Sequence, residues 1–177
     1  MTWPRRNASQ RFSLSFPRKT DQKAYSGHKH HRCAKVQVLA NLDGQVVDVS
    51  PAYLGSVHDK TLWNKEAPRL KPLFDSLVLC DKAYAGATGE VGKPDAPACL
   101  VRPIKRGENA WKADPEKAKD FNRQLSKQRV GIEHVFARLK TWRVLGGLLQ
   151  YRWERLGPIV RALAVVHNAN RQLSAAD

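Results

Sequence analysis

Two carboxylates of this chain stand where they could hold a metal ion for chemistry on phosphate esters. Asp81 closes the apolar run SLVLCD, residues 76–81, which is typical of a strand buried on both faces. The carboxyl ends of such strands are where α/β proteins place their ligands. Glu133 is the only acid in RVGIEHVFARLK, residues 129–140, where every other charge is positive. Carboxylates suit Mg²⁺ or Mn²⁺, and a pair of such ions can hold the attacking and the leaving oxygen of a phosphoryl transfer.

Cations accompany Glu133 at helical spacing. Residues 129, 133, 136 and 140 are separated by four, three and four positions, so on a helix they would lie along one stripe. One interpretation makes Glu133 a metal ligand beside a phosphodiester, with Arg129 and Lys140 on nearby phosphates and Arg138 as a further contact. The alternative is an ordinary surface pair between Arg129 and Glu133, which contributes a few tenths of a kcal/mol.

Asp81 and Asp59 also have structural interpretations. Asp81 could cap the turn DKAYAG through its own backbone instead of binding a metal. Asp59 in GSVHDK is either a site residue or the acid at the start of a helix, and its spacing favours the helix start.

The segment YSGHKHHR contains His28, His30 and His31 but follows no recognised metal-ligand spacing. Because Lys29 and other cations lie among these histidines, we expect His28 and Lys29 to contact phosphates or solvent and not zinc.

The composition indicates a polyanion as partner. The chain of 177 residues carries 31 Lys and Arg against 16 Asp and Glu, a formal net charge of +15. These cations are spread along the chain, which favours a folded basic face that meets nucleic acid through its phosphates. The alternative is a generally solvated basic surface, as on an RNA-associated structural protein.

Cysteine usage and hydropathy bound the compartment. The 3 cysteines are odd in number and far apart, so they support neither a disulfide framework nor a zinc site with paired ligands. No apolar run reaches the length of a transmembrane helix, and the N-terminus lacks the apolar stretch of a secretory signal. We therefore expect a cytoplasmic protein.

The pattern of residues predicts an α/β domain over 25–177, after an irregular basic segment over 1–24 in which only 12–16 alternates like a strand. An Asp-Gly turn between two alternating runs predicts a hairpin over 34–50. Two further strands are expected at 76–81 and 98–101, with a loop at 86–97 between them. A helix is expected to begin at Ser56 or His58 and to end at Pro68, and helical structure is expected from Asp114, with a break at Gly146 and Gly147. A last helix is expected from about 153 to 173, and its apolar face consists of Ile159, Leu163, Val166 and Leu173.

Four motifs, YSGHKHH, LGSVHDK, LVLCDKAY and FNRQLSKQRVGIEHVFARLKTW, occur in an order that resembles the catalytic domain of bacterial insertion-sequence transposases of the DDE class, the group with Harbinger-like relatives. The similarity spans roughly residues 23 to 173. It implies a ribonuclease-H-like mixed sheet flanked by helices, with a helical C-terminal part. It also implies a divalent metal, DNA as partner, and strand cleavage and transfer at transposon ends. We further expect association with the nucleoid, and we consider a homodimer.

The resemblance assigns roles to particular residues. It implies that Asp81 and Glu133 are catalytic metal ligands, and that Arg129 and Lys140 belong to the signature around Glu133. In the motif around Asp81, the resemblance implies Tyr84 as an auxiliary residue, and Ala83 replaces the family's glycine. In the signature around Glu133, Ser126 stands where the family has tyrosine. A further motif of the family matches Gly55, Ser56, His58 and Asp59, and there Leu54 replaces proline.

One acid of the family's triad is missing. It should lie on the opening strand, yet RNASQRFSLSFP contains neither Asp nor Glu. We therefore expect a first strand that is incomplete or degraded, and a truncated or inactive copy without the N-terminal DNA-binding region. The alternatives are a transposase-derived protein that only binds DNA and a basic RNA-associated structural protein.

Overall fold

A seven-stranded sheet forms the centre of the computed structural model, which describes residues 6–15, 24–27, 30–70, 77–89 and 100–174. The strands are β1 (Arg6–Ser15), β2 (Tyr25–Ser26), β3 (His31–Asn41), β4 (Val46–Val49), β5 (Tyr53–Leu54), β6 (Leu77–Leu79) and β7 (Leu100–Val101). The helices are α1 (Asp59–Leu70), η3 (Lys82–Tyr84), α2 (Asn109–Ala113), α3 (Pro115–Lys140), η4 (Trp153–Arg155) and α4 (Leu156–Leu173).

The sheet is mixed, as expected. Its main path runs β2-β3-β1-β6-β7, and β4 and β5 also pair with β3. β3 is antiparallel to β1 and to β4, whereas β1, β6 and β7 run parallel to one another. The predicted hairpin is confirmed as β3 and β4, with Gly44 at φ 76° in the turn, a conformation that glycine adopts without strain.

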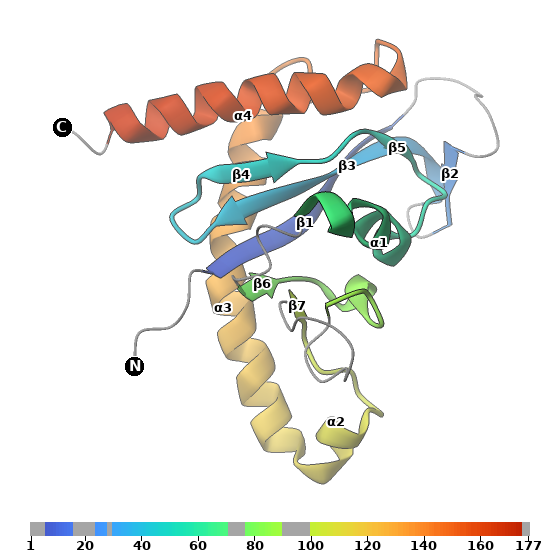
Figure 1. Ribbon diagram of the computed structural model, residues 1–177, viewed down its shortest axis with the longest axis vertical. Helices are drawn as coiled ribbons and strands as arrows, with labels where there is room; N and C mark the ends of the chain where they lie inside the picture. The colour runs from blue at the N-terminus through green and yellow to red at the C-terminus, as the bar shows by residue number, and fades with distance from the viewer. Residues whose placement is uncertain (1–5, 16–23, 28–29, 71–76, 90–99, 175–177) are drawn as a thin grey trace.

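Helices cover both faces of this sheet. Alternate residues of β3 face opposite sides, so Val36 and Val38 join one hydrophobic cluster with α3 and α4, and Leu39 joins another with α1 and η3. In β6, Val78 and Leu79 divide in the same way, which confirms a strand buried on both faces. Figure 1 shows α4 lying across one end of the molecule and α3 running past the sheet toward α2 at the other end.

The opening strand differs from the prediction. β1 extends from Arg6 to Ser15, so it is longer than the short strand expected at 12–16, and the segment 1–24 is not irregular throughout. β1 pairs with β3 on one side and with β6 on the other, so it is neither incomplete nor degraded. The polar sequence RNASQRFSLS concealed a central strand because such strands usually carry apolar runs.

The boundaries of the helices also bring corrections. Pro68 does not end α1, which continues to Leu70, because a proline in the last turn removes only one backbone donor.

The predicted start of α3 is confirmed. Asp114 caps the helix by accepting a hydrogen bond from the Lys117 amide at 2.9 Å, and Pro115 takes the first helical position.

The apolar face predicted for the last helix is wrong in part. Val166 and Leu173 are exposed, while Ile159 and Leu163 are only partly buried. The buried residues of α4 are Leu156, Gly157, Val160, Ala164 and His167. None of the described helices is both long and apolar enough to span a membrane.

Candidate functional site

Asp81 lies just beyond the carboxyl end of β6, where the chain turns into η3. Its Oδ1 accepts a hydrogen bond from the Lys82 amide at 2.5 Å, and the residue caps this short helix. The capping interpretation is therefore correct. Asp81 is nevertheless exposed, so its carboxylate keeps acceptor capacity on the open side.

Tyr84 fixes the turn that carries Asp81. Its ring is buried and packs edge-on against Trp63, with the ring centroids 6.1 Å apart. Its hydroxyl accepts a hydrogen bond from Gln37 Nε2 at 2.9 Å, and its amide donates to the Asp81 carbonyl at 3.1 Å. Tyr84 thus acts as a positioning residue. Gln37 was missed by sequence reasoning, although a polar residue recurring in the alternation AKVQVLA signals a polar contact on that face of β3.

Asp59 is the first residue of α1 and is not an open site residue. It is buried, and its Oδ1 lies 3.0 Å from Nζ of Lys35 on β3. This confirms the interpretation as the acid at a helix start. Lys35 was not singled out from the sequence, because a lysine in a strand normally faces solvent.

Gly55, in the same motif as Asp59, lies where its backbone comes very close to Ala24 and Cys33. A Cβ on Gly55 would lie 2.6 Å from the Ala24 carbonyl oxygen and 2.7 Å from the Cys33 Sγ. The Gly55 amide also donates to the Cys33 carbonyl at 2.7 Å. No other residue type fits this position without a shift of the strands.

Glu133 lies on α3, but the stripe predicted around it is divided. Glu133 and Lys140 are exposed, whereas Arg129 and Phe136 are buried, with Arg129 only 9% exposed. Within the described residues, Arg129 Nε has no hydrogen-bond partner, and no ion pair joins Arg129 to Glu133. The surface-pair interpretation is therefore wrong.

The two acids lie near different parts of the sheet. Asp81 follows the carboxyl end of β6, which runs parallel to β1. α3 passes the turn of the β3–β4 hairpin at Gly131, where a Cβ would lie 3.3 Å from the Leu42 backbone oxygen. Because β1 and β3 are antiparallel, that turn adjoins the amino end of β1. Glu133 comes two residues after this crossing.

Asp81 and Glu133 have the oxygen donors that Mg²⁺ prefers. Across the part of the chain that the structure describes, however, no group of three or more His, Cys, Asp or Glu side chains is placed to hold a metal ion. The described residues therefore do not form a complete metal site by themselves, and β1 contributes no carboxylate to one.

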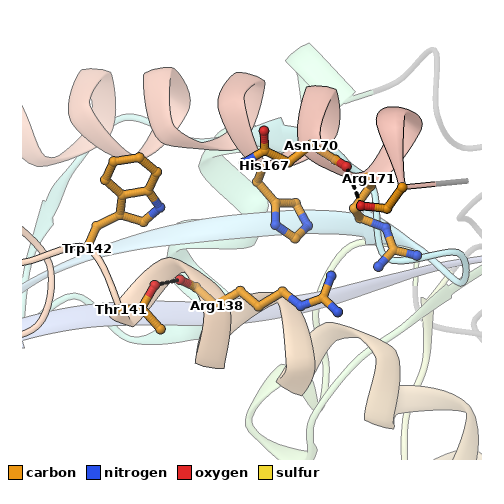
Figure 2. A pocket seen from close by; sticks show the side chains of 7 residues that line it. Arg138, Thr141, Trp142, His167, Asn170 and Arg171 are labelled. Carbon is orange, nitrogen blue, oxygen red and sulfur yellow. Dashed lines mark hydrogen bonds between the residues drawn. The ribbon is translucent and has the colours of Figure 1, made fainter. Parts of the chain in front are cut away.

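Arg138 lines a pocket of about 500 Å³ between the C-terminal ends of α3 and α4. Figure 2 shows the side chains of Arg138 and Arg171 extending into the same gap between the helices, and His167 projecting from α4 into that gap. His167 is buried, and its Nε2 lies 2.9 Å from the Gly44 carbonyl oxygen. The other described residues that line it are Thr141, Trp142, Asn170 and Ser174, so none of the described lining residues is an acid. Two predicted phosphate contacts, His28 and Lys29, lie outside the described residues.

Comparison with known proteins places this geometry in context. The model of the family "DDE superfamily endonuclease" matches residues 10–168. A protein from Microchaete diplosiphon, "Probable transposase for insertion sequence element IS702", is 26% identical over 159 residues, which are 90% of this chain and 54% of that protein. The chain thus spans about half the length of this relative. No solved structure matches the chain.

Proposed function

Because the chain belongs to the DDE superfamily endonucleases, we propose that it is the part of an insertion-sequence transposase that binds DNA and carries the residues for strand cleavage. The observation that carries this proposal is the exposed Asp81 at the carboxyl end of β6, in a turn held by Tyr84. Glu133 on α3 is the second acid. The site of action would be the bacterial nucleoid, and a homodimer stays a prediction.

Cleavage by this polypeptide is proposed to depend on Mg²⁺ or Mn²⁺ and to be weak. A bound divalent ion would supply charge stabilisation for the transferred phosphoryl group. Sites of this kind usually need a third carboxylate, and β1 has none. We therefore expect little transposition activity from the chain as it stands.

The proposed DNA contacts are the exposed cations at the end of α3. Arg138 and Lys140 are open to solvent, and the formal net charge of +15 gives a long-range attraction to phosphates. Arg129 is retained in the proposed set as a buried member, with an Nε that has no partner among the described residues. His28 and Lys29 also belong to the proposed set and lie outside the described residues. Such binding must weaken steeply as salt rises.

The test measures nicking of supercoiled plasmid DNA by the purified chain in Mg²⁺ or Mn²⁺. The variants are Asp81→Asn and Glu133→Gln, and the control is Asp43→Asn in the exposed hairpin turn. We expect slow nicking that both variants abolish and the control retains. Fast cleavage that depends on Asp81 would contradict the proposal that the activity is weak. Nicking that both variants retain would contradict the proposal that Asp81 and Glu133 form the site.

A second candidate function is DNA binding without catalysis. The absence of a complete acid cluster among the described residues favours it. Binding would then survive Asp81→Ala and Glu133→Ala, and no metal-dependent nicking would be seen in any variant. Preference for RNA over DNA of the same sequence would instead favour an RNA-associated structural protein.

A further inference from the structure

A second hollow lies directly beside the turn that carries Asp81. It has a volume of about 410 Å³, and the described residues that line it are Lys82, Ile104, Lys105, Arg106, Trp111, Lys119 and Asn122. Four of these side chains are cationic and none is acidic. Lys82 is the residue whose amide donates to the Asp81 carboxylate, so the hollow and Asp81 share one turn.

The loop that presents two of the cations is anchored to α3. The Asn122 side chain accepts a hydrogen bond from the Ile104 amide at 2.7 Å and donates one to the Ile104 carbonyl at 2.9 Å. These two bonds replace the partners that a regular strand or helix would supply. Lys105 and Arg106, which follow Ile104, are therefore held at a fixed place on the rim.

An ion pair inside the loop neutralises its own acid. Arg102 Nη2 lies 2.9 Å from Glu108 Oε1, and the Lys105 amide donates to Glu108 Oε2 at 3.1 Å. The hydrogen bond from Arg102 is the main reason why the pKa of Glu108 lies below its ordinary value. Since Glu108 is engaged in this way, the charges of Lys105 and Arg106 are not cancelled at the rim.

Two further acids must be weighed against the cations. Lys119 lies 2.6 Å from Glu116, but both side chains are more than half exposed, so this pair is weak. Asp81 itself is negative and adjoins Lys82. The hollow remains cationic because Lys105 and Arg106 have no ion pair within the described residues.

Trp111 gives the hollow an aromatic surface. It lies on α2, is half-buried, and has the Arg106 guanidinium 5.8 Å from its ring centroid. A flat ring next to cations is the combination that binds unpaired nucleotides, because a base stacks on the ring while the phosphates contact the cations. A paired base in duplex DNA has no free face for such stacking.

We propose that this hollow binds a single unpaired strand of DNA, with phosphates on Lys82, Lys105 and Arg106 and a base on Trp111. The proposal rests on the proposed function for the identity of the polymer, but not for cleavage. It places an unpaired strand beside the turn that carries Asp81.

The test uses fluorescence anisotropy of a labelled oligothymidylate of about 12 nucleotides with the full chain. The double variant Lys105→Glu with Arg106→Glu should bind much more weakly. The slope of log K against log salt should fall by about 0.7 for each lost phosphate contact. The control, Arg143→Glu with Arg155→Glu, makes the same change of charge at exposed cations elsewhere. Equal losses in variant and control would overturn the proposal.

Trp111 provides the sharper measurement. Trp111→Ala should weaken binding of the single strand about 5-fold or more, whereas Trp111→Phe should keep most of it and duplex binding should not change. Circular dichroism of each variant checks that the fold is intact. Tighter binding of duplex that ignores Trp111 would refute the hollow as a single-strand site.

The two proposals can fail separately. If Asp81→Asn leaves nicking unchanged while Trp111→Ala lowers single-strand binding, only the cleavage proposal fails. If nicking depends on Asp81 but changes at Lys105, Arg106 and Trp111 do not alter single-strand binding, only the proposal of a single-strand site in the hollow fails.

Discussion

Lys35 and Asp59 form an ion pair beneath α1, with Nζ 3.0 Å from Oδ1 and side chains only 4% and 6% exposed. The pair joins the middle of β3 to the first residue of α1. Its carboxylate also lies at the amino end of a helix, where negative charge is favourable. The motif that contains Asp59 therefore holds the helix against the sheet, on the face where Tyr84 holds the turn of Asp81.

Removal of one partner should destabilise the fold. Asp59→Asn would leave the Lys35 ammonium buried without a counter-charge, which costs about 3–5 kcal/mol. Urea denaturation measures the free energy of unfolding of each variant, and Asp43→Asn at an exposed position is the control. In a double-mutant cycle, the variant with both Lys35→Met and Asp59→Leu should lose less free energy of unfolding than the sum of the losses in the two single variants. Additive losses would contradict an interaction between the two side chains.

A methyl group at position 55 should also destabilise the chain. Gly55→Ala places a Cβ 2.6 Å from the Ala24 carbonyl oxygen and 2.9 Å from the Cys33 carbonyl oxygen, so the backbone around these residues must shift, at a cost of about 1–3 kcal/mol. Gly147→Ala is the matched control, since a Cβ there meets nothing within 4 Å. Thermal unfolding compares the two variants. Equal melting temperatures would show that the close approach at Gly55 relaxes freely.

Glu108 should titrate below its ordinary pKa of 4.5, because Arg102 donates a hydrogen bond to its carboxylate and the Lys105 amide adds a second. The folded pKa is lower than the unfolded one, so the stabilisation is complete above the unfolded pKa and is lost as pH falls through the folded pKa. Carbon-detected NMR titration measures the shift. Arg102→Ala should return the pKa toward 4.5, and Arg106→Ala should change it little.

A carboxylate on β1 should strengthen metal binding. Asn7 pairs with Val78 of β6 in the parallel register, on the strand where the family's missing acid is expected. Asn7→Asp adds a charge with almost no change of shape. We expect tighter binding of Mn²⁺, measured by electron paramagnetic resonance of the free ion. The control Gln150→Glu adds a charge in the exposed connection before α4. An equal gain from the control would contradict a site at β1 and β6.

The sequence alone predicted elements whose signals are local. The β3–β4 hairpin follows from an Asp-Gly turn between alternating runs, and the start of α3 follows from Asp114 and Pro115. The family is also readable, because its motifs occur in order along the chain. The hairpin and the helix start depend on residues close in sequence, whose backbone preferences act before any packing.

Tertiary structure decided what depends on partners far apart in the chain. β1 has a polar sequence and is a central strand only because β3 and β6 supply hydrogen bonds on both sides. Arg129 and Glu133 share a predicted stripe, yet packing against the sheet buries the first and leaves the second in solvent. The Lys35–Asp59 pair likewise forms across 24 positions of sequence. Helical spacing defines which residues share a face, but only the contact with another element defines which face is buried.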